Sequence, residues 1–352
     1  MAVQISLFNH KGGVSKTTTA FNLGWMLAEK GKRVLLADCD PQCNLTGMVL
    51  GFKGTEDFAA VYEAGGVRNI RDGLAPAFES RPAPIVPVEC EVIEGQDNLF
   101  LIPGHIGLAE YEVTLGIAQE LSGSLVTLQN LPGSINHLFH LTAQHYGCDF
   151  IIVDMSPSLG PINQNLLMTS DFFLVPMAPD YFSVMATESL ATVLPKWKSW
   201  ATQAQASSVL QKATYPYPSV NPKFLGTVIQ KYRIREGQTP SAAFQKWIDE
   251  IEAGVKSRLL PSLDACGMLL DQAVYLEADA DPTKPLLQMS DFNGLIALSQ
   301  KHKVPVFALT DDQLEQDGIV LERTRKSMNK FKELFETAAD KIIALTSHAA
   351  CD

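Results

Sequence analysis

Short runs of apolar and β-branched residues recur along the chain, and helical patterns separate them. Several runs are apolar throughout rather than alternating, which is typical of parallel strands buried on both faces. This alternation predicts an α/β fold of the P-loop NTPase type, in which a mostly parallel twisted sheet has helices on both faces. The runs that predict strands are Val3–Phe8, Arg33–Ala37, Leu99–Ile102, Phe150–Val153, Phe172–Pro176, Phe224–Ile229 and Val304–Leu309.

The first helix between these strands can be predicted in detail. Its apolar residues fall at i, i+3, i+4 and i+7, so they form one stripe that faces the sheet. Gly31 follows this stripe and predicts the end of the helix before the next strand begins. The stripe consists of Ala20, Leu23, Gly24 and Leu27.

Two stretches interrupt the alternation of strands and helices. A proline-rich excursion is expected at about 51–98, and a long loop or linker rich in Ala, Gln and Ser at about 202–222. Strand-like runs resume after both stretches, so residues 1–352 are expected to form a single domain. A last helix is predicted at about 320–345, with an apolar stripe of Met328, Phe331, Phe335, Ala338, Ile342 and Leu345.

Charge narrows the range of partners. The chain has 28 Lys and Arg against 39 Asp and Glu, so its net charge is −11. This balance excludes a protein that holds nucleic acid everywhere by bulk charge, but it permits a local basic face. The last helix offers such a face for DNA or a partner, although a core-packing helix with a solvated side explains it equally well. Its basic residues are Arg323, Arg325, Lys326, Lys330 and Lys332, which Lys231, Arg233 and Arg235 would extend.

Cysteine usage and hydropathy predict a reduced, cytoplasmic chain. The six cysteines are too widely spread for a disulfide scaffold, and we expect neither a signal peptide nor a membrane-spanning segment. Cys39 and Cys43 are expected to be packed thiols. The remaining cluster of His137, His140, His145 and Cys148 suits zinc by atom type, but a polar surface helix is the better interpretation.

The segment after the first predicted strand carries the clearest chemical signal. It reads Asn9-His10-Lys11-Gly12-Gly13-Val14-Ser15-Lys16-Thr17-Thr18 and precedes a predicted helix. Glycines let backbone N–H groups turn towards phosphate oxygens, and the helix N-terminus adds the positive end of its dipole. The segment therefore predicts a phosphate-binding loop in which Lys16 reaches the β- and γ-phosphates and the Thr17 hydroxyl binds Mg²⁺.

This loop departs from the general G-x-x-x-x-G-K-[ST] pattern. His10 and Ser15 stand where that pattern has its two glycines. Gly12 and Gly13 supply the flexibility instead, and a second lysine, Lys11, stands beside them. The arrangement resembles the deviant Walker A motif of the ParA/MinD family, in which a glycine is common at the position of Ser15.

Two later segments extend this resemblance. Val34–Gln42 is similar to the family's second motif, where Asp40 matches an aspartate near the attacking water and Mg²⁺. Phe150–Gly160 is similar to the family's Walker B strand and switch loop, where Asp154 matches the aspartate that holds Mg²⁺ through water. Independently of the family, carboxylates that end buried parallel strands face the crevice where α/β folds bind ligands.

The resemblance implies an ATP-hydrolysing dimerisation switch with Mg²⁺ as its metal. In the family the extra lysine, here Lys11, reaches across an ATP-bound homodimer to the partner's nucleotide, and hydrolysis separates the subunits. The implied catalytic residues are Lys11, Lys16 and Asp40, and the implied metal-binding residues are Thr17 and Asp154. The implied nucleotide-binding residues are Lys11, Gly12, Gly13, Val14, Ser15, Lys16, Thr17 and Thr18.

The sequence leaves two classes of biological role open for such a switch. Partition of plasmids or chromosomes, or positioning of another cargo, is favoured, with a ParB-like activating protein and nucleoid association where DNA is bound. The alternative is an ATP-controlled assembly component of a mobile-element or defence system. A P-loop metabolic ligase is less expected, because such enzymes need no second lysine like Lys11. Membrane attachment is not expected.

Overall fold

A largely parallel sheet runs through the centre of the computed structural model, which describes residues 1–51, 62, 66–121, 126–232, 242–292 and 294–347. The strand order in this part of the chain is β3-β4-β2-β5-β1-β6-β7-β8, and only the β3–β4 pair is antiparallel. The predicted fold class is therefore confirmed. The strands are β1 Val3–Leu7, β2 Val34–Cys39, β3 Glu91–Ile93, β4 Gln96–Ile102, β5 Phe150–Met155, β6 Phe172–Met177, β7 Lys223–Tyr232 and β8 Pro285–Ser290.

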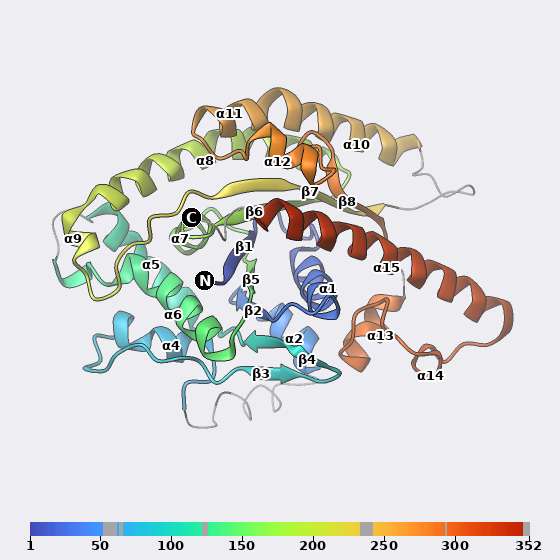
Figure 1. The fold of residues 1–352 in the computed structure, drawn as a ribbon, viewed down its shortest axis with the longest axis horizontal. Helices are drawn as coiled ribbons and strands as arrows, with labels where there is room; N and C mark the ends of the chain where they lie inside the picture. The colour runs from blue at the N-terminus through green and yellow to red at the C-terminus, as the bar shows by residue number, and fades with distance from the viewer. Residues whose placement is uncertain (52–61, 63–65, 122–125, 233–241, 293, 348–352) are drawn as a thin grey trace.

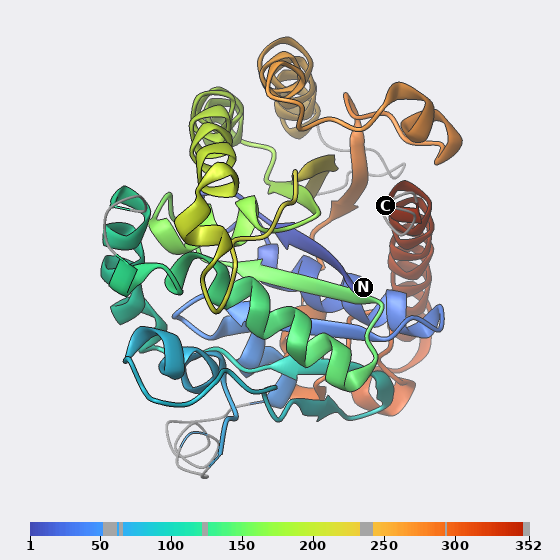
Figure 2. The same cartoon turned by 60° about the vertical axis from the view of Figure 1, so that its left-hand side comes forward.

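Helices cover both faces of the sheet and enclose two hydrophobic cores (Figures 1 and 2). One core lies under α4 to α8, α10 and α11, and the other under α1, α2, α12, α13 and α15. The helices are α1 Lys16–Glu29, α2 Asn44–Leu50, α4 Ile70–Phe78, α5 Leu108–Glu120, α6 Leu131–Tyr146, α7 Pro161–Met168, α8 Tyr181–Ala206, α9 Ser208–Gln211, α10 Ala242–Gly254, α11 Leu260–Ala265, α12 Gln272–Glu277, α13 Leu295–His302, α14 Asp311–Leu314 and α15 Gly318–Thr346. None of the helices in these described ranges has the length and hydrophobicity needed to cross a bilayer.

The last predicted helix packs through its apolar stripe, whereas the first, α1, is buried on all sides from Thr19 to Ala28. A Cβ placed on Gly24 of α1 would come within 2.6 Å of the Leu36 side chain, so glycine allows this helix to approach the sheet closely. Gly31 ends the helix in the left-handed conformation, with φ at +80°. On α15, all six residues of the predicted stripe from Met328 to Leu345 are buried.

The last predicted strand is wrong. Residues Val304–Leu309 form turns rather than a strand, and Pro305 has no N–H to donate to a sheet. Val306, Phe307 and Leu309 are buried nonetheless, and the Phe307 ring centroid lies 5.6 Å from that of Phe335 on α15. Residues 285–290 form the edge strand β8 in place of the predicted strand.

The stretch 202–222 is not a linker. Its start belongs to α8 and to α9, and the coil that follows is packed against two other segments. A Cβ on Gly133 of α6 would lie 2.2 Å from the carbonyl oxygen of Tyr215, so only glycine fits beneath this coil. The Tyr215 hydroxyl in turn accepts a hydrogen bond of 2.9 Å from the backbone N–H of Ile85, in the proline-rich excursion. This coil, which is part of one predicted excursion, therefore contacts both α6 and the other, proline-rich excursion.

Candidate nucleotide-binding site

The topology gathers the predicted site at one edge of the sheet. β1 lies between β5 and β6, and β5 lies between β1 and β2. In the strand register Asp154 stands opposite Leu7 on one side and opposite Asp38 on the other. The glycine loop that leaves β1 therefore starts beside the carboxylates that end β2 and β5, as expected for an α/β ligand site.

Asn9 anchors the glycine loop to the neighbouring strand. Its side-chain amide donates a hydrogen bond of 2.8 Å to the carbonyl oxygen of Pro176, and its Oδ1 accepts one of 2.9 Å from the N–H of Lys11. Gly13 adopts φ +73°, which glycine accepts without strain. Ser15 is also left-handed, at φ +64°, which costs a non-glycine residue roughly 1–2 kcal/mol. The loop thus keeps its turn at the position where the family commonly has glycine.

The Lys16 side chain folds back over the loop at the start of α1. Its Nζ donates hydrogen bonds of 3.0 Å to the carbonyl oxygen of Asn9 and 3.2 Å to that of Lys11. Burial lowers the pKa of Lys16, while the nearby Asp154 and Asp40 oppose this shift. A buried cation beside the loop carbonyls is well placed to exchange these contacts for phosphate oxygens.

Asp154 is fully buried and lacks a hydrogen-bond partner among the described residues for either carboxylate oxygen. Burial raises its pKa well above the ordinary value, and Asp38 adds to this, whereas the Thr17 hydroxyl and Lys16 act in the opposite direction. Two buried carboxylate oxygens beside a threonine hydroxyl match the hard oxygen ligands that Mg²⁺ prefers. The side chains present therefore fit the metal that the motifs imply.

Asp38 supports Asp40 from the end of β2. It accepts hydrogen bonds from the N–H and hydroxyl of Thr46, at 2.8 and 2.6 Å, and from the N–H of Asp40 at 3.2 Å. Burial raises the pKa of Asp38 to about 6. Asp40 itself is 7% exposed and accepts a hydrogen bond of 3.0 Å from the N–H of Gln42. Asp38 was not among the predicted site residues, although its place two residues before Asp40 at a strand end was the available signal.

Lys11 is bound within its own chain. Its Nζ donates to the carboxylate of Asp180 and to Ser183 Oγ, and it lies 5.9 Å from the centroid of the Phe182 ring. All three partners belong to the start of α8, which follows β6 at the same edge of the sheet. No local pattern indicates this contact, because 169 positions separate Lys11 from Asp180.

The loop after β5 also lies against the glycine loop. A Cβ on Gly12 would meet the Pro157 side chain at 3.8 Å. The buried Asn163 of α7 donates hydrogen bonds of 2.8 and 2.9 Å to the carbonyl oxygens of Ser156 and Ser158. One asparagine, which was not among the predicted site residues, therefore fixes the shape of the loop that touches the candidate phosphate site.

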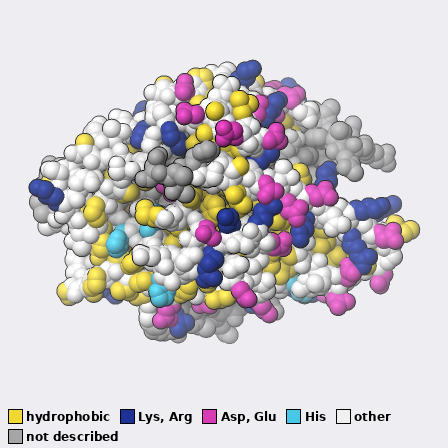
Figure 3. Space-filling view, viewed as in Figure 1, with side chains coloured by type: hydrophobic (Ala, Val, Ile, Leu, Met, Phe, Trp, Pro, Cys, Tyr) yellow, Lys and Arg dark blue, Asp and Glu magenta, His cyan; other side chains and the backbone are white. Residues whose placement is uncertain are grey.

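The basic residues of the last helix lie apart from this site, on turns of α15 that extend beyond the body (Figure 1). Arg325 is bound to Asp311, and Lys332 to Glu29 at 3.1 Å, whereas Arg323 and Lys326 are exposed. At that end of the molecule Lys and Arg side chains are mixed with Asp and Glu (Figure 3). Arg233, Arg235 and the side chain of Lys231 lie outside the described residues.

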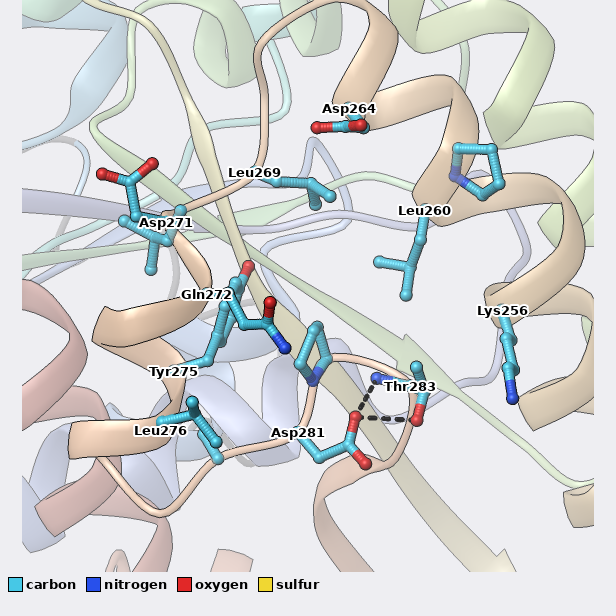
Figure 4. Close-up of a pocket in the computed structure, with 14 residues that line it drawn as sticks. Lys256, Leu260, Asp264, Leu269, Asp271, Gln272, Tyr275, Leu276, Asp281 and Thr283 are labelled. Carbon is cyan, nitrogen blue, oxygen red and sulfur yellow. Dashed lines mark hydrogen bonds between the residues drawn. The ribbon is translucent and has the colours of Figure 1, made fainter.

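Other candidate clusters show no metal geometry in the described ranges, where no three His, Cys, Asp or Glu side chains group around one point. His140 is half-buried, and burial lowers its pKa to about 4. Cys39 and Cys43 are buried, as predicted. A separate pocket of about 790 Å³ lies between α11, α12 and the segment before β8, and it shares no residue with the glycine loop (Figure 4).

Fold and site together define a P-loop nucleotide-binding protein of the α/β class. The family model described as an AAA domain matches residues 2–204, which is more than half of the chain. The chain belongs to this family, and its motifs place it among the ParA- and MinD-type ATPases.

Relatives and solved structures agree with this assignment. An uncharacterized protein of Methanocaldococcus jannaschii is 29% identical over 83% of this chain and 93% of its own length. The sporulation initiation inhibitor protein Soj of Bacillus subtilis is 34% identical, but the match spans only 53% of this chain and 62% of Soj. The structure of pNOB8 ParA bound to nonspecific DNA has the same fold, with a TM-score of 0.54 and 19% identity over 99% of both chains.

Proposed function

We propose that the protein is a ParA-type ATPase whose binding of Mg-ATP makes two copies associate and whose hydrolysis separates them. The observation that carries this proposal is the buried Lys16, which lies beside the buried carboxylate of Asp154, at the sheet edge where the second lysine, Lys11, also lies. Partition or cargo positioning is its favoured duty, in the cytoplasm and with a ParB-like activating protein. We take the whole chain, residues 1–352, as a single domain.

Each site residue has a stated part in this proposal. Lys16 and the N–H groups of residues 12–18 bind the phosphates. Thr17 and, through water, Asp154 would hold Mg²⁺, which would supply positive charge opposite the phosphates. Asp40, held by Asp38, orients the attacking water. Lys11 stabilises the developing phosphoryl charge of the partner's nucleotide, as an arginine finger does.

An apolar surface beside Lys11 supports association of two copies. Tyr181, Phe182 and Met185 at the start of α8 are 55%, 68% and 45% exposed, and Leu159 of the loop after β5 is 43% exposed. Neighbouring large apolar side chains at a surface mark sites of protein contact. These residues flank Lys11 and the glycine loop. A second copy bound there would therefore bring its own nucleotide close to Lys11 of the first copy.

Asp40→Ala tests the switch. Loss of the water-orienting carboxylate is expected to slow phosphate release by roughly 10²-fold or more, and to leave ATP binding intact. The variant should therefore accumulate as an ATP dimer, measured as molar mass by light scattering with and without Mg-ATP. Asp312→Ala, at an exposed aspartate of α14, is the control. Unchanged turnover in Asp40→Ala would exclude Asp40 from the reaction.

DNA binding separates partition from the assembly alternative. Arg323 and Lys326 project from the exposed turns of α15, so they are our candidates for contacts with phosphates of nonspecific DNA. With ATP at low salt, the double variant Arg323→Ala/Lys326→Ala should bind DNA more weakly, and the slope of log affinity against log salt should fall by about 2. Lys212→Ala, at an exposed lysine directly after α9 and outside this basic face, is the control. If the wild-type protein binds no DNA under these conditions, the assembly role is favoured instead.

A further inference from the structure

The contacts of Lys11 direct it towards its own α8 rather than towards a second subunit. Its Nζ binds the Asp180 carboxylate and Ser183 Oγ, the latter at 3.3 Å, and it faces the ring of Phe182. Only 18% of the Lys11 side chain is exposed as a result. A lysine engaged in this way has to give up these contacts before it can reach another nucleotide.

Asp180 performs two separable tasks in this arrangement. Its Oδ1 accepts a hydrogen bond of 2.9 Å from the N–H of Ser183 and so caps the N-terminus of α8. Its Oδ2 binds Lys11. Capping needs only an oxygen acceptor, which Asn and Ser also provide, whereas the ion pair with Lys11 needs the negative charge. A substitution of Asp180 can therefore remove the ion pair with Lys11 and keep the cap of α8.

We propose that Asp180 is a positioning residue that holds Lys11 within the single chain and thereby sets how readily two ATP-bound copies associate. This inference rests on the proposed function, because it takes Lys11 to act across a dimer. Each of the two subunits must break one Lys11–Asp180 pair, so the opposing free energy enters twice per dimer. Partly exposed ion pairs are weak, so we expect a graded effect of roughly threefold to tenfold on the dimer dissociation constant.

The first measurement needs neither nucleotide nor dimer. Reductive methylation of the nucleotide-free protein, followed by mass spectrometry, reports how freely the amine of each lysine reacts. Asp180→Asn is expected to raise the labelling rate of Lys11 severalfold, while the exposed Lys212 keeps its rate. An unchanged Lys11 rate overturns the inference, because Asp180 then does not hold the amine. Asp180→Ser, which also keeps a capping oxygen, guards against an effect peculiar to asparagine.

The second measurement follows association of Asp180→Asn by light scattering at saturating Mg-ATP. The dimer dissociation constant should fall roughly threefold to tenfold, with unchanged ATP affinity of the single chain. Glu188→Gln is the matched control, because this carboxylate lies on the same helix but pairs with Arg258 at 3.2 Å. Faster Lys11 labelling without tighter association also overturns the inference. A wild-type protein that never associates with ATP instead contradicts the proposed function, and the labelling result shows which of the two has failed.

Discussion

Lys16→Ala is expected to abolish ATP binding. The Lys16 ammonium is buried beside the glycine loop, where phosphate oxygens would replace the carbonyl oxygens of Asn9 and Lys11 as its partners. Charge-assisted contacts in such a site are stronger than exposed ones, so we expect ATP affinity to fall by roughly 10²- to 10³-fold. Equilibrium titration with a fluorescent ATP analogue measures this loss directly.

Two further variants separate binding from folding in that experiment. Lys16→Ala also removes a cation from the neighbourhood of Asp154 and Asp40, so its thermal unfolding must be compared with that of the wild type. Lys16→Met keeps most of the buried stem and should lose ATP affinity to a similar extent. Lys212→Ala, at an exposed lysine of the coil after α9, should bind as the wild type does. Near-normal affinity in both Lys16 variants would remove this lysine from the phosphate site.

Lys11→Ala is expected to leave ATP binding largely intact and to remove turnover. Lys11 Nζ contacts Asp180 and Ser183 rather than the glycine loop, so the phosphate site of the single chain does not depend on its charge. If it acts as an arginine finger does, its loss should lower kcat by roughly 10³-fold and prevent the ATP dimer. Phosphate release and light scattering on the same samples measure both effects.

Mixing two inactive variants tests whether Lys11 acts across the dimer. In a mixed dimer the Lys11→Ala subunit keeps its own Asp40 and receives Lys11 from an Asp40→Ala partner. One of its two sites is then complete, so the mixture should recover turnover that neither variant shows alone. Full hydrolysis by Lys11→Ala as a single chain, or no recovery in the mixture, would contradict the action in trans.

Local patterns predicted the parts of the fold that surround the candidate site. β2 and β5 are mainly apolar runs buried on both faces, whereas β1 also buries the polar Gln4 and Ser6. The helix after the glycine loop was predictable from its apolar stripe, although α1 is buried on all sides. The run Val304–Leu309 was misleading because periodicity reports burial, and a buried turn that contains Pro305 has the same composition as a short strand. β8 was missed as a strand because its half-buried residues and its initial Pro285 weaken the pattern.

The candidate site was predictable only where its residues adjoin motifs. Lys16, Thr17, Asp40 and Asp154 stand at strand and helix ends that sequence alone identifies, and their roles stay predictions. The pairing of Lys11 with Asp180 depends on which strand ends meet at the sheet edge, which local spacing does not encode. Tertiary packing, rather than propensity, decides such contacts.

The coil after α9 has a practical consequence for engineering this chain. Its composition suggests a tolerant position for a fused fluorescent protein or an affinity sequence, yet the carbonyl oxygen of Tyr215 sits over Gly133 and its hydroxyl binds the N–H of Ile85. An insertion there would pull apart α6, the proline-rich excursion and the end of α8.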